Sequence, residues 1–147
     1  MTVDVTTEIE INRPIEAVAS FASDPDNVML WYKNIHTVEW QTQRPLKIGS
    51  KVAFVAKFMG RQLSYTYEFV DIRPNQSLTM RTSAGPFPMQ TSYTWRAQGN
   101  ATIMTLTNRG EPTGFSKLIA PLMTMAMRKA TQNDLARLKA LLEQQDV

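Results

Sequence analysis

Residues 51–69 read KVAFVAKFMGRQLSYTYEF, and this stretch decides the fold. Apolar residues stand at every second position on both sides of Met59-Gly60-Arg61. The side chains of a strand point alternately to its two faces, so this alternation is typical of a strand with one buried face. A glycine between two such runs favours a tight turn, because it adopts dihedral angles that other residues avoid. The stretch therefore predicts a β-hairpin that carries its large aromatic side chains on one face.

The same alternation continues on both sides of this hairpin. Further strands are predicted at residues 3–11, 35–43, 77–82, 89–96 and 102–107. The later strands are separated by turn-forming sequences: Arg73-Pro74-Asn75, Ala84-Gly85-Pro86 and Gln98-Gly99-Asn100. Short strands at hairpin spacing are typical of an antiparallel sheet, so the sequence predicts a curved antiparallel sheet of seven strands.

Helices are predicted in two places. Residues 14–22 have helical spacing with Asn12 as a candidate N-cap, and Ser23-Asp24-Pro25 begins a second short helix. Residues 115–143 predict one long helix. Its first half, residues 118–127, is apolar nearly all round, so we expect this half to be enclosed on most sides and the amphipathic second half to lie on a surface.

The order strand, two short helices, six strands and long helix predicts an α+β fold in a single domain spanning residues 1–147. One helix, about 10 Å across, cannot fill the concavity of such a sheet. The remaining space is filled either by large side chains of the protein itself or by a ligand, and the sequence leaves both open. The bulky side chains expected around this space are the candidate ligand-binding residues: Trp31, Phe54, Phe58, Tyr65, Tyr67, Phe69, Met80, Met89, Tyr93, Trp95, Met104, Leu118, Leu122 and Met123.

Several segments in order carry a resemblance to a known superfamily. They are residues 21–27 (FASDPDN), Trp31-Tyr32, residues 45–52 (PLKIGSKV), Tyr67-Glu68-Phe69 and residues 134–139 (DLARLK). Together they resemble the SRPBCC superfamily, the group of START, polyketide cyclase/dehydrase and pollen-allergen proteins. The resemblance covers almost the whole chain. It implies a helix-grip fold with a deep cavity between the sheet and the C-terminal helix, and it carries over no catalytic residue.

Three classes of function remain open. The first, which we favour, is a non-enzymatic carrier or sensor of a small hydrophobic molecule. The second is an enzyme of the cyclase or dehydratase kind that works without metal, which requires polar groups that converge on one buried point. The third is a regulator that binds another protein, as in a toxin–antitoxin or stress pair, which predicts a large exposed apolar patch.

Few residues are candidates for chemistry. The chain has one histidine, His36, and no cysteine, so we expect neither a metal site nor a cofactor. His36 is expected at a loop edge, and Glu68 on the outer face of its strand. Arg109 and Glu111 are expected as a surface ion pair near the cavity mouth. The loop at residues 85–88 (GPFP) predicts either a lid or a simple hairpin turn.

Charge and hydropathy exclude other classes. The net charge is +3 and the basic residues are scattered, so we do not expect nucleic-acid binding. The sequence shows neither a secretory signal pattern nor a stretch of about 20 apolar residues, so we expect no membrane insertion and a cytoplasmic location. The expected partner is a small hydrophobic molecule, and the expected assembly is a monomer or a weak homodimer.

Overall fold

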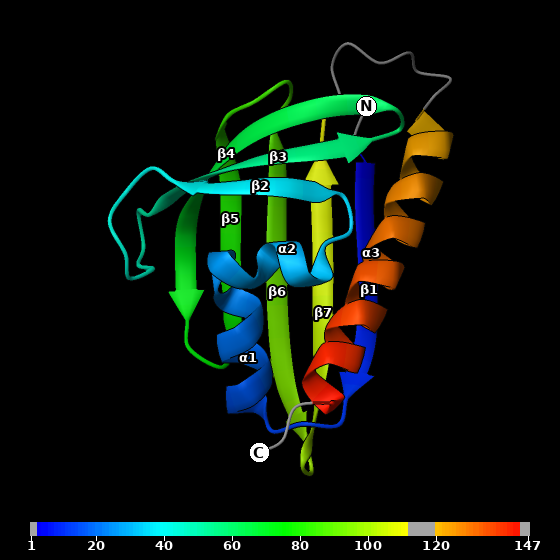
Figure 1. The fold of residues 1–147 in the computed structure, drawn as a ribbon. Helices are drawn as coiled ribbons and strands as arrows, with labels where there is room; N and C mark the ends of the chain where they lie inside the picture. The colour runs from blue at the N-terminus through cyan, green and yellow to red at the C-terminus, as the bar shows by residue number, and fades with distance from the viewer. Residues whose placement is uncertain (1–2, 112–119, 145–147) are drawn as a thin grey trace.

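A computed structural model describes residues 3–111 and 120–144 of the chain (Figure 1). The helices are α1 (Ile15–Ser23), the 3-10 turn η1 (Pro25–Asn27), α2 (Val28–Trp31) and α3 (Ala120–Glu143). The strands are β1 (Val3–Ile11), β2 (Ile35–Trp40), β3 (Lys51–Phe58), β4 (Arg61–Arg73), β5 (Ser77–Ala84), β6 (Met89–Gln98) and β7 (Ala101–Gly110). The predicted element order is confirmed. The part of the predicted long helix before Ala120 lies outside the described residues.

All seven strands form one antiparallel sheet in the order β1-β7-β6-β5-β4-β3-β2. Neighbours in sequence are neighbours in the sheet from β2 to β7, as a meander requires. β1 is the exception, because it pairs with β7 along its whole length, from Val3 opposite Gly110 to Ile11 opposite Thr102. The α+β helix-grip fold predicted from the sequence is therefore confirmed.

The sheet curls strongly: β2, β3 and the first part of β4 run across the view of Figure 1, whereas β6 and β7 run along it. Bulges accompany the curl, and an extra residue on one strand increases its local bend. The register of β4 shifts between Phe69 and Asp71, and that of β2 shifts between Ile35 and Thr37. The first shift lets both Phe69 and Ile72 face the core although they are three residues apart.

Helix α3 packs by one face along its described length, from Met123 at 0% exposure onward, so the expectation that its first half is enclosed on most sides is wrong. Leu135, Leu138 and Leu142 are at most 1% exposed. In contrast, Leu122 is 58% exposed and Met125 is 65% exposed. A helix is buried where a partner faces it, so an apolar circumference does not by itself enclose the first turns.

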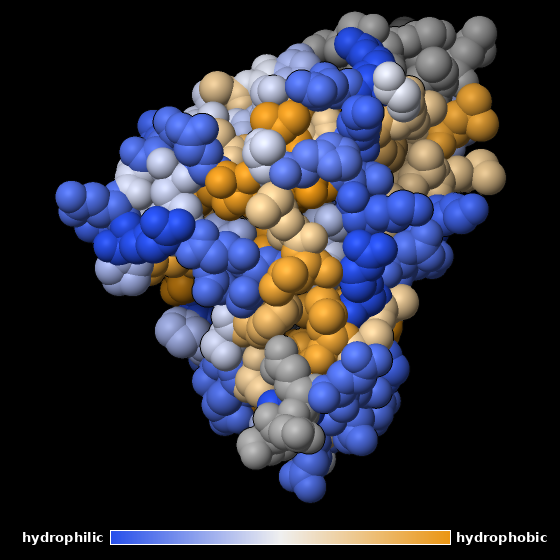
Figure 2. All heavy atoms as spheres, in the orientation of Figure 1, coloured by the Kyte–Doolittle hydropathy of each residue, from blue (hydrophilic) through white to orange (hydrophobic). Residues whose placement is uncertain are grey.

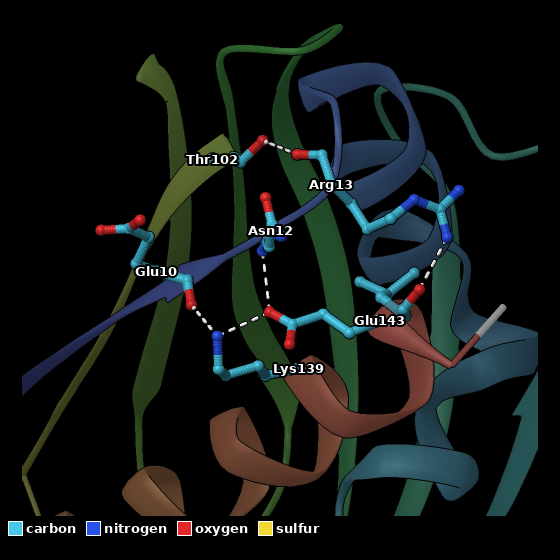
Figure 3. Close-up of polar contacts among 7 residues, drawn as sticks. Glu10, Asn12, Arg13, Thr102, Lys139 and Glu143 are labelled. Carbon is cyan, nitrogen blue, oxygen red and sulfur yellow. Dashed lines mark hydrogen bonds and ion pairs between the residues drawn. The ribbon is translucent and has the colours of Figure 1, made fainter. Parts of the chain in front are cut away.

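The C-terminal end of α3 is fastened to the end of β1 by polar contacts (Figure 3). The Lys139 ammonium donates to the Glu10 carbonyl at 2.7 Å and pairs with the Glu143 carboxylate at 2.6 Å. Glu143 also accepts from the backbone N–H of Asn12 at 2.8 Å, and an Arg13 guanidinium N–H donates to the Leu142 carbonyl at 2.6 Å. We call this set of contacts the α3 clasp.

The start of α1 differs from the prediction. Pro14 occupies the N-cap position and no side chain caps the helix, so the role predicted for Asn12 is wrong. The backbone of Asn12 serves the α3 clasp instead. The predicted start of the second short helix at Ser23-Asp24-Pro25 is confirmed. The Asp24 carboxylate accepts from the backbone N–H of Asp26 at 2.9 Å at the beginning of η1.

The surface keeps several large apolar side chains exposed. In the described part of the chain they are Met29 and Leu30 on α2, Ile48 and Met59 between strands, and Leu122 and Met125 on α3. Figure 2 shows apolar atoms in the middle of one face, around α2, and again at the start of α3, with hydrophilic residues between them. No described helix is both long and apolar enough to cross a membrane.

Candidate functional site

A cavity of about 150 Å³ lies between the curled sheet and α3. Two clusters of buried side chains meet there. The first contains Phe54, Met80 and Tyr93 together with the leucines of the second half of α3. The second contains Leu63, Tyr65, Phe87, Met89 and Met127. The cavity is lined by members of both clusters, so it marks the place where the two halves of the core do not fully join.

Half of the fourteen predicted ligand-binding residues line this cavity. They are Phe54, Phe58, Tyr65, Tyr67, Met80, Met89 and Tyr93. All seven lie on β3 to β6, where strand alternation determines which side chains face inward.

Of the other seven predicted residues, six do not line the cavity and one lies outside the described residues. Five of the six are buried in the two clusters, where they fill the core: Trp31, Phe69, Trp95, Met104 and Met123. Leu122 points to solvent, so its expected inward position is wrong. Leu118 lies outside the described residues.

Two tyrosine hydroxyls meet at the cavity wall. The hydroxyl oxygens of Tyr32, just after α2, and Tyr93, on β6, are 2.6 Å apart and share a hydrogen bond. Burial raises the pKa of both phenols well above the ordinary value, so both are neutral donors and acceptors at any physiological pH. Only one of the two hydroxyl hydrogens lies between them, which leaves the other for a further acceptor.

A carboxylate stands beside this tyrosine pair. Asp134 lines the cavity from α3 and is 4% exposed. Its Oδ1 accepts from the backbone N–H of Lys33 at 3.1 Å. Burial raises the pKa of Asp134 to about 6, although the Lys33 N–H and the charges of Arg137 and Lys33 act in the opposite direction.

A second polar pair lies elsewhere on the wall. The Thr91 hydroxyl donates to Asn108 Oδ1 at 2.7 Å, and both side chains line the cavity. Burial raises the pKa of the neighbouring Tyr67 to about 12, while hydrogen bonding with Thr91 lowers it. The wall is otherwise apolar, apart from Asn34, Lys57 and Thr131.

The loop between β5 and β6 closes part of the cavity. Phe87 is 5% exposed, lines the cavity and packs edge-on against the Tyr65 ring with 5.8 Å between centroids. Gly85 passes so close to the same ring that an added Cβ would lie 2.5 Å from Tyr65 Cδ1. The loop is therefore both the connection between two strands and part of the cavity wall.

Sequence reasoning missed Tyr32, Thr91, Asn108 and Asp134 as cavity residues. For Asp134 a signal was present. Positions 127, 131, 134 and 138 recur at helical spacing and all are buried, so an aspartate at 134 stands on the face of α3 that meets the sheet. A charged residue on a core-facing position is the kind of inconsistency that marks functional sites.

Other residues considered for chemistry lie apart from the cavity. His36 is exposed. Arg109 pairs with Asp4 at 3.1 Å rather than with Glu111. A surface groove of about 400 Å³ next to α1 contains Asp26, but both oxygens of this carboxylate bind Arg44, and one also accepts from Trp40 Nε1. The cavity is therefore the better candidate site.

Comparisons with known proteins agree with this geometry. Residues 2–143 match the model of a family described as "Polyketide cyclase / dehydrase and lipid transport". No curated protein matches the chain.

Among solved structures, TTHA0849 from Thermus thermophilus has a TM-score of 0.84 at 20% identity over 95% of this chain and 97% of its own. A START superfamily protein from Mycobacterium smegmatis has a TM-score of 0.82 at 14% identity, covering 96% and 97%. The Zhui aromatase/cyclase from Streptomyces sp. R1128 has a TM-score of 0.81 at 14% identity, covering 97% and 94%. At these identities the likeness shows the shared fold.

Proposed function

The chain belongs to the polyketide cyclase/dehydrase and lipid transport family, within the START/SRPBCC superfamily, and on that premise we propose that it binds a small hydrophobic molecule in the cavity between sheet and α3. The observation that carries the proposal is the cavity wall. It consists mainly of aromatic, methionine and aliphatic side chains with a few convergent polar groups, which is the usual composition of a small-molecule site.

The size of the cavity limits the ligand. Its volume of about 150 Å³ is close to that of engineered cavities that bind benzene, and smaller than most drug-sized pockets. A one-ring molecule therefore fits the wall as it stands. A larger ligand requires rotation of flexible side chains, and Met80, Met89 and Met127 are placed to provide it.

The test uses toluene as a probe and two leucine substitutions on the same helix. Ala130 lines the cavity, whereas Ala136 is exposed on α3. We expect Ala130→Leu to fill the cavity and abolish toluene binding in ligand-observed NMR, and Ala136→Leu to leave it unchanged. Equal binding by both variants would show that toluene binds elsewhere. Native mass spectrometry of the purified protein, followed by organic extraction, would identify a natural ligand.

A second candidate is an enzyme of the cyclase or dehydratase kind. The observation in its favour is that Tyr32, Tyr93 and Asp134 converge on one wall of the cavity, and that the raised pKa of Asp134 suits proton transfer near neutral pH. The solved aromatase/cyclase shares the fold. Turnover of a polyketide-like substrate that disappears in Asp134→Asn, while substrate binding persists, would favour this candidate over a carrier.

A further inference from the structure

Asp134 is an incompletely satisfied carboxylate at the wall of an apolar cavity. It is 4% exposed, and its neighbours on the same face of α3 are Thr131, Leu135 and Leu138. The backbone N–H of Lys33 binds Oδ1. Across residues 3–111 and 120–144, no hydrogen bond to Oδ2 is found. Because Asp134 lines the cavity, a ligand bound there could supply a donor to this oxygen.

The tyrosine pair complements this acceptor. Tyr32 and Tyr93 are bound to each other at 2.6 Å and use one of their two hydroxyl hydrogens in that bond. The negative charge of Asp134 is close enough to both phenols to raise their pKa values. The cavity wall therefore offers one charged acceptor and one hydroxyl donor at the same place.

We propose that Tyr32, Tyr93 and Asp134 form a recognition site for a ligand hydroxyl, so that the cavity selects a phenol of about one-ring size over a hydrocarbon of the same shape. The ligand hydroxyl donates to Asp134 Oδ2 and accepts from the free tyrosine hydroxyl. The ring lies against the aromatic and methionine wall. This inference rests on the proposed binding function and specifies the ligand class.

The charges around Asp134 favour a neutral donor over a cationic one. Lys33 after α2 and Arg137 on α3 both act on the carboxylate, and Lys57 on β3 lines the cavity. A ligand ammonium would meet these three positive charges, whereas a hydroxyl would not.

The same site predicts a pH-dependent preference. The titratable groups that interact with Asp134 are Tyr32 and Lys33 from the α2 side, Tyr93 from β6 and Arg137 from α3, and Tyr67 from β4 acts in turn on the two tyrosines. Burial raises the pKa values of the three tyrosines, so these phenols stay neutral between pH 5 and pH 8, whereas the carboxyl of Asp134, with its pKa of about 6, titrates in this range. The preference for the hydroxyl is strongest at pH 8 and weakens at pH 5, because an ionised acceptor binds a donor more strongly than a neutral one.

The experiment compares p-cresol with toluene by NMR titration at pH 8. In Asp134→Asn the affinity for p-cresol is expected to fall about tenfold, while the affinity for toluene stays within about twofold of the wild type. Asp71→Asn is the matched control, because this carboxylate pairs with Arg73 at 3.3 Å and does not line the cavity. Tyr32→Phe provides a second variant that removes one hydroxyl, and it should lower p-cresol affinity without changing toluene affinity.

The outcomes separate this inference from the proposed function. If Asp134→Asn and Tyr32→Phe bind both probes as the wild type does, the hydroxyl site is refuted while the hydrophobic cavity stands. If the wild-type protein binds neither probe at millimolar concentration, the binding function itself fails and the hydroxyl site fails with it. Selective loss of p-cresol in both variants supports the inference.

Discussion

Replacing Asp134 by asparagine should stabilise the protein at pH 8. The carboxyl is buried at the cavity wall with a pKa of about 6 against an ordinary value of 3.8. That difference corresponds to about 3 kcal/mol by which ionisation is harder in the folded state than in the unfolded state. Asparagine keeps an oxygen for the Lys33 N–H and carries no charge, so it removes this cost.

The pH dependence of this stabilisation follows from proton linkage. Folding raises this pKa, so between about pH 3.8 and pH 6 the folded protein binds more protons than the unfolded chain. The contribution of Asp134 to stability is therefore fully present below pH 3.8 and is lost as the pH rises through 6. The difference in stability between Asp134→Asn and the wild type should be under about 1 kcal/mol at pH 4 and approach about 3 kcal/mol at pH 8.

Urea unfolding at a series of pH values measures this difference directly. Subtracting the wild-type curve from that of the variant removes the contributions of other groups, such as Asp26, whose pKa is lowered by Arg44. A variant that is less stable than the wild type at pH 8 would refute the reasoning. It would show that the ionised carboxylate makes contacts in the folded protein that outweigh its burial.

Three further predictions test the fold. Leu138→Ala should lower the free energy of unfolding by about 2–5 kcal/mol, because this side chain is fully buried, whereas Leu122→Ala should change it by less than about 0.5 kcal/mol. Equal effects in urea unfolding would contradict the assignment of the packed face of α3. Gly85→Ala should cost about 1–3 kcal/mol and alter the near-ultraviolet circular dichroism, because the new methyl group displaces the Tyr65 ring; an unchanged spectrum and midpoint would count against that close approach. Glu143→Gln should cost about 0.5–1 kcal/mol at pH 7 by weakening the α3 clasp. Because these contacts lower the pKa of Glu143, the difference should vanish as the pH falls through its titration, and a difference that persists at pH 3 would refute an ionic origin.

The sheet could be predicted in detail because strand alternation is a local property. β1 was predicted with its observed ends, and the turns at Gly60 and Gly99 lie where glycine permits positive φ. The bulge after Phe69 could not be placed, because an extra residue changes the inward face without leaving a pattern in one strand.

The first half of α3 is less enclosed than its composition predicted, because composition does not say which sides of a helix have a packing partner. Residues 118–127 are the most apolar part of the helix, yet in the described turns Leu122 and Met125 face away from the sheet. Burial depends on which side of the helix faces β1 and the core, and this is a long-range relationship that composition does not contain. In both halves the buried residues, from Met123 to Leu142, recur at helical spacing on one side.

For the candidate site, the sequence predicted the part of the cavity wall that the strands form. It did not predict that Tyr32 and Asp134 lie together at this wall. The aromatic residues on β3, β4 and β6 follow from alternation. Tyr32 and Asp134 come from segments about a hundred residues apart, and only the docking of α3 against α2 brings them together. In a single sequence, the only indication that these two residues lie close together is an aspartate on an apolar helix face.

The pairing of β1 with β7 also determines when the protein can fold during synthesis. Within the described residues β1 pairs with β7 alone, and this partner is made about a hundred residues after β1, since Val3 lies opposite Gly110. At roughly 5–20 residues per second, β1 waits on the order of ten seconds for its partner, with the apolar side chains Val3, Val5 and Ile11 uncovered. Contacts of such high sequence separation slow folding, and unpaired apolar strands are prone to associate with other chains. We therefore expect the yield of this protein in cells to respond more strongly to chaperones and to translation rate than its final stability would suggest.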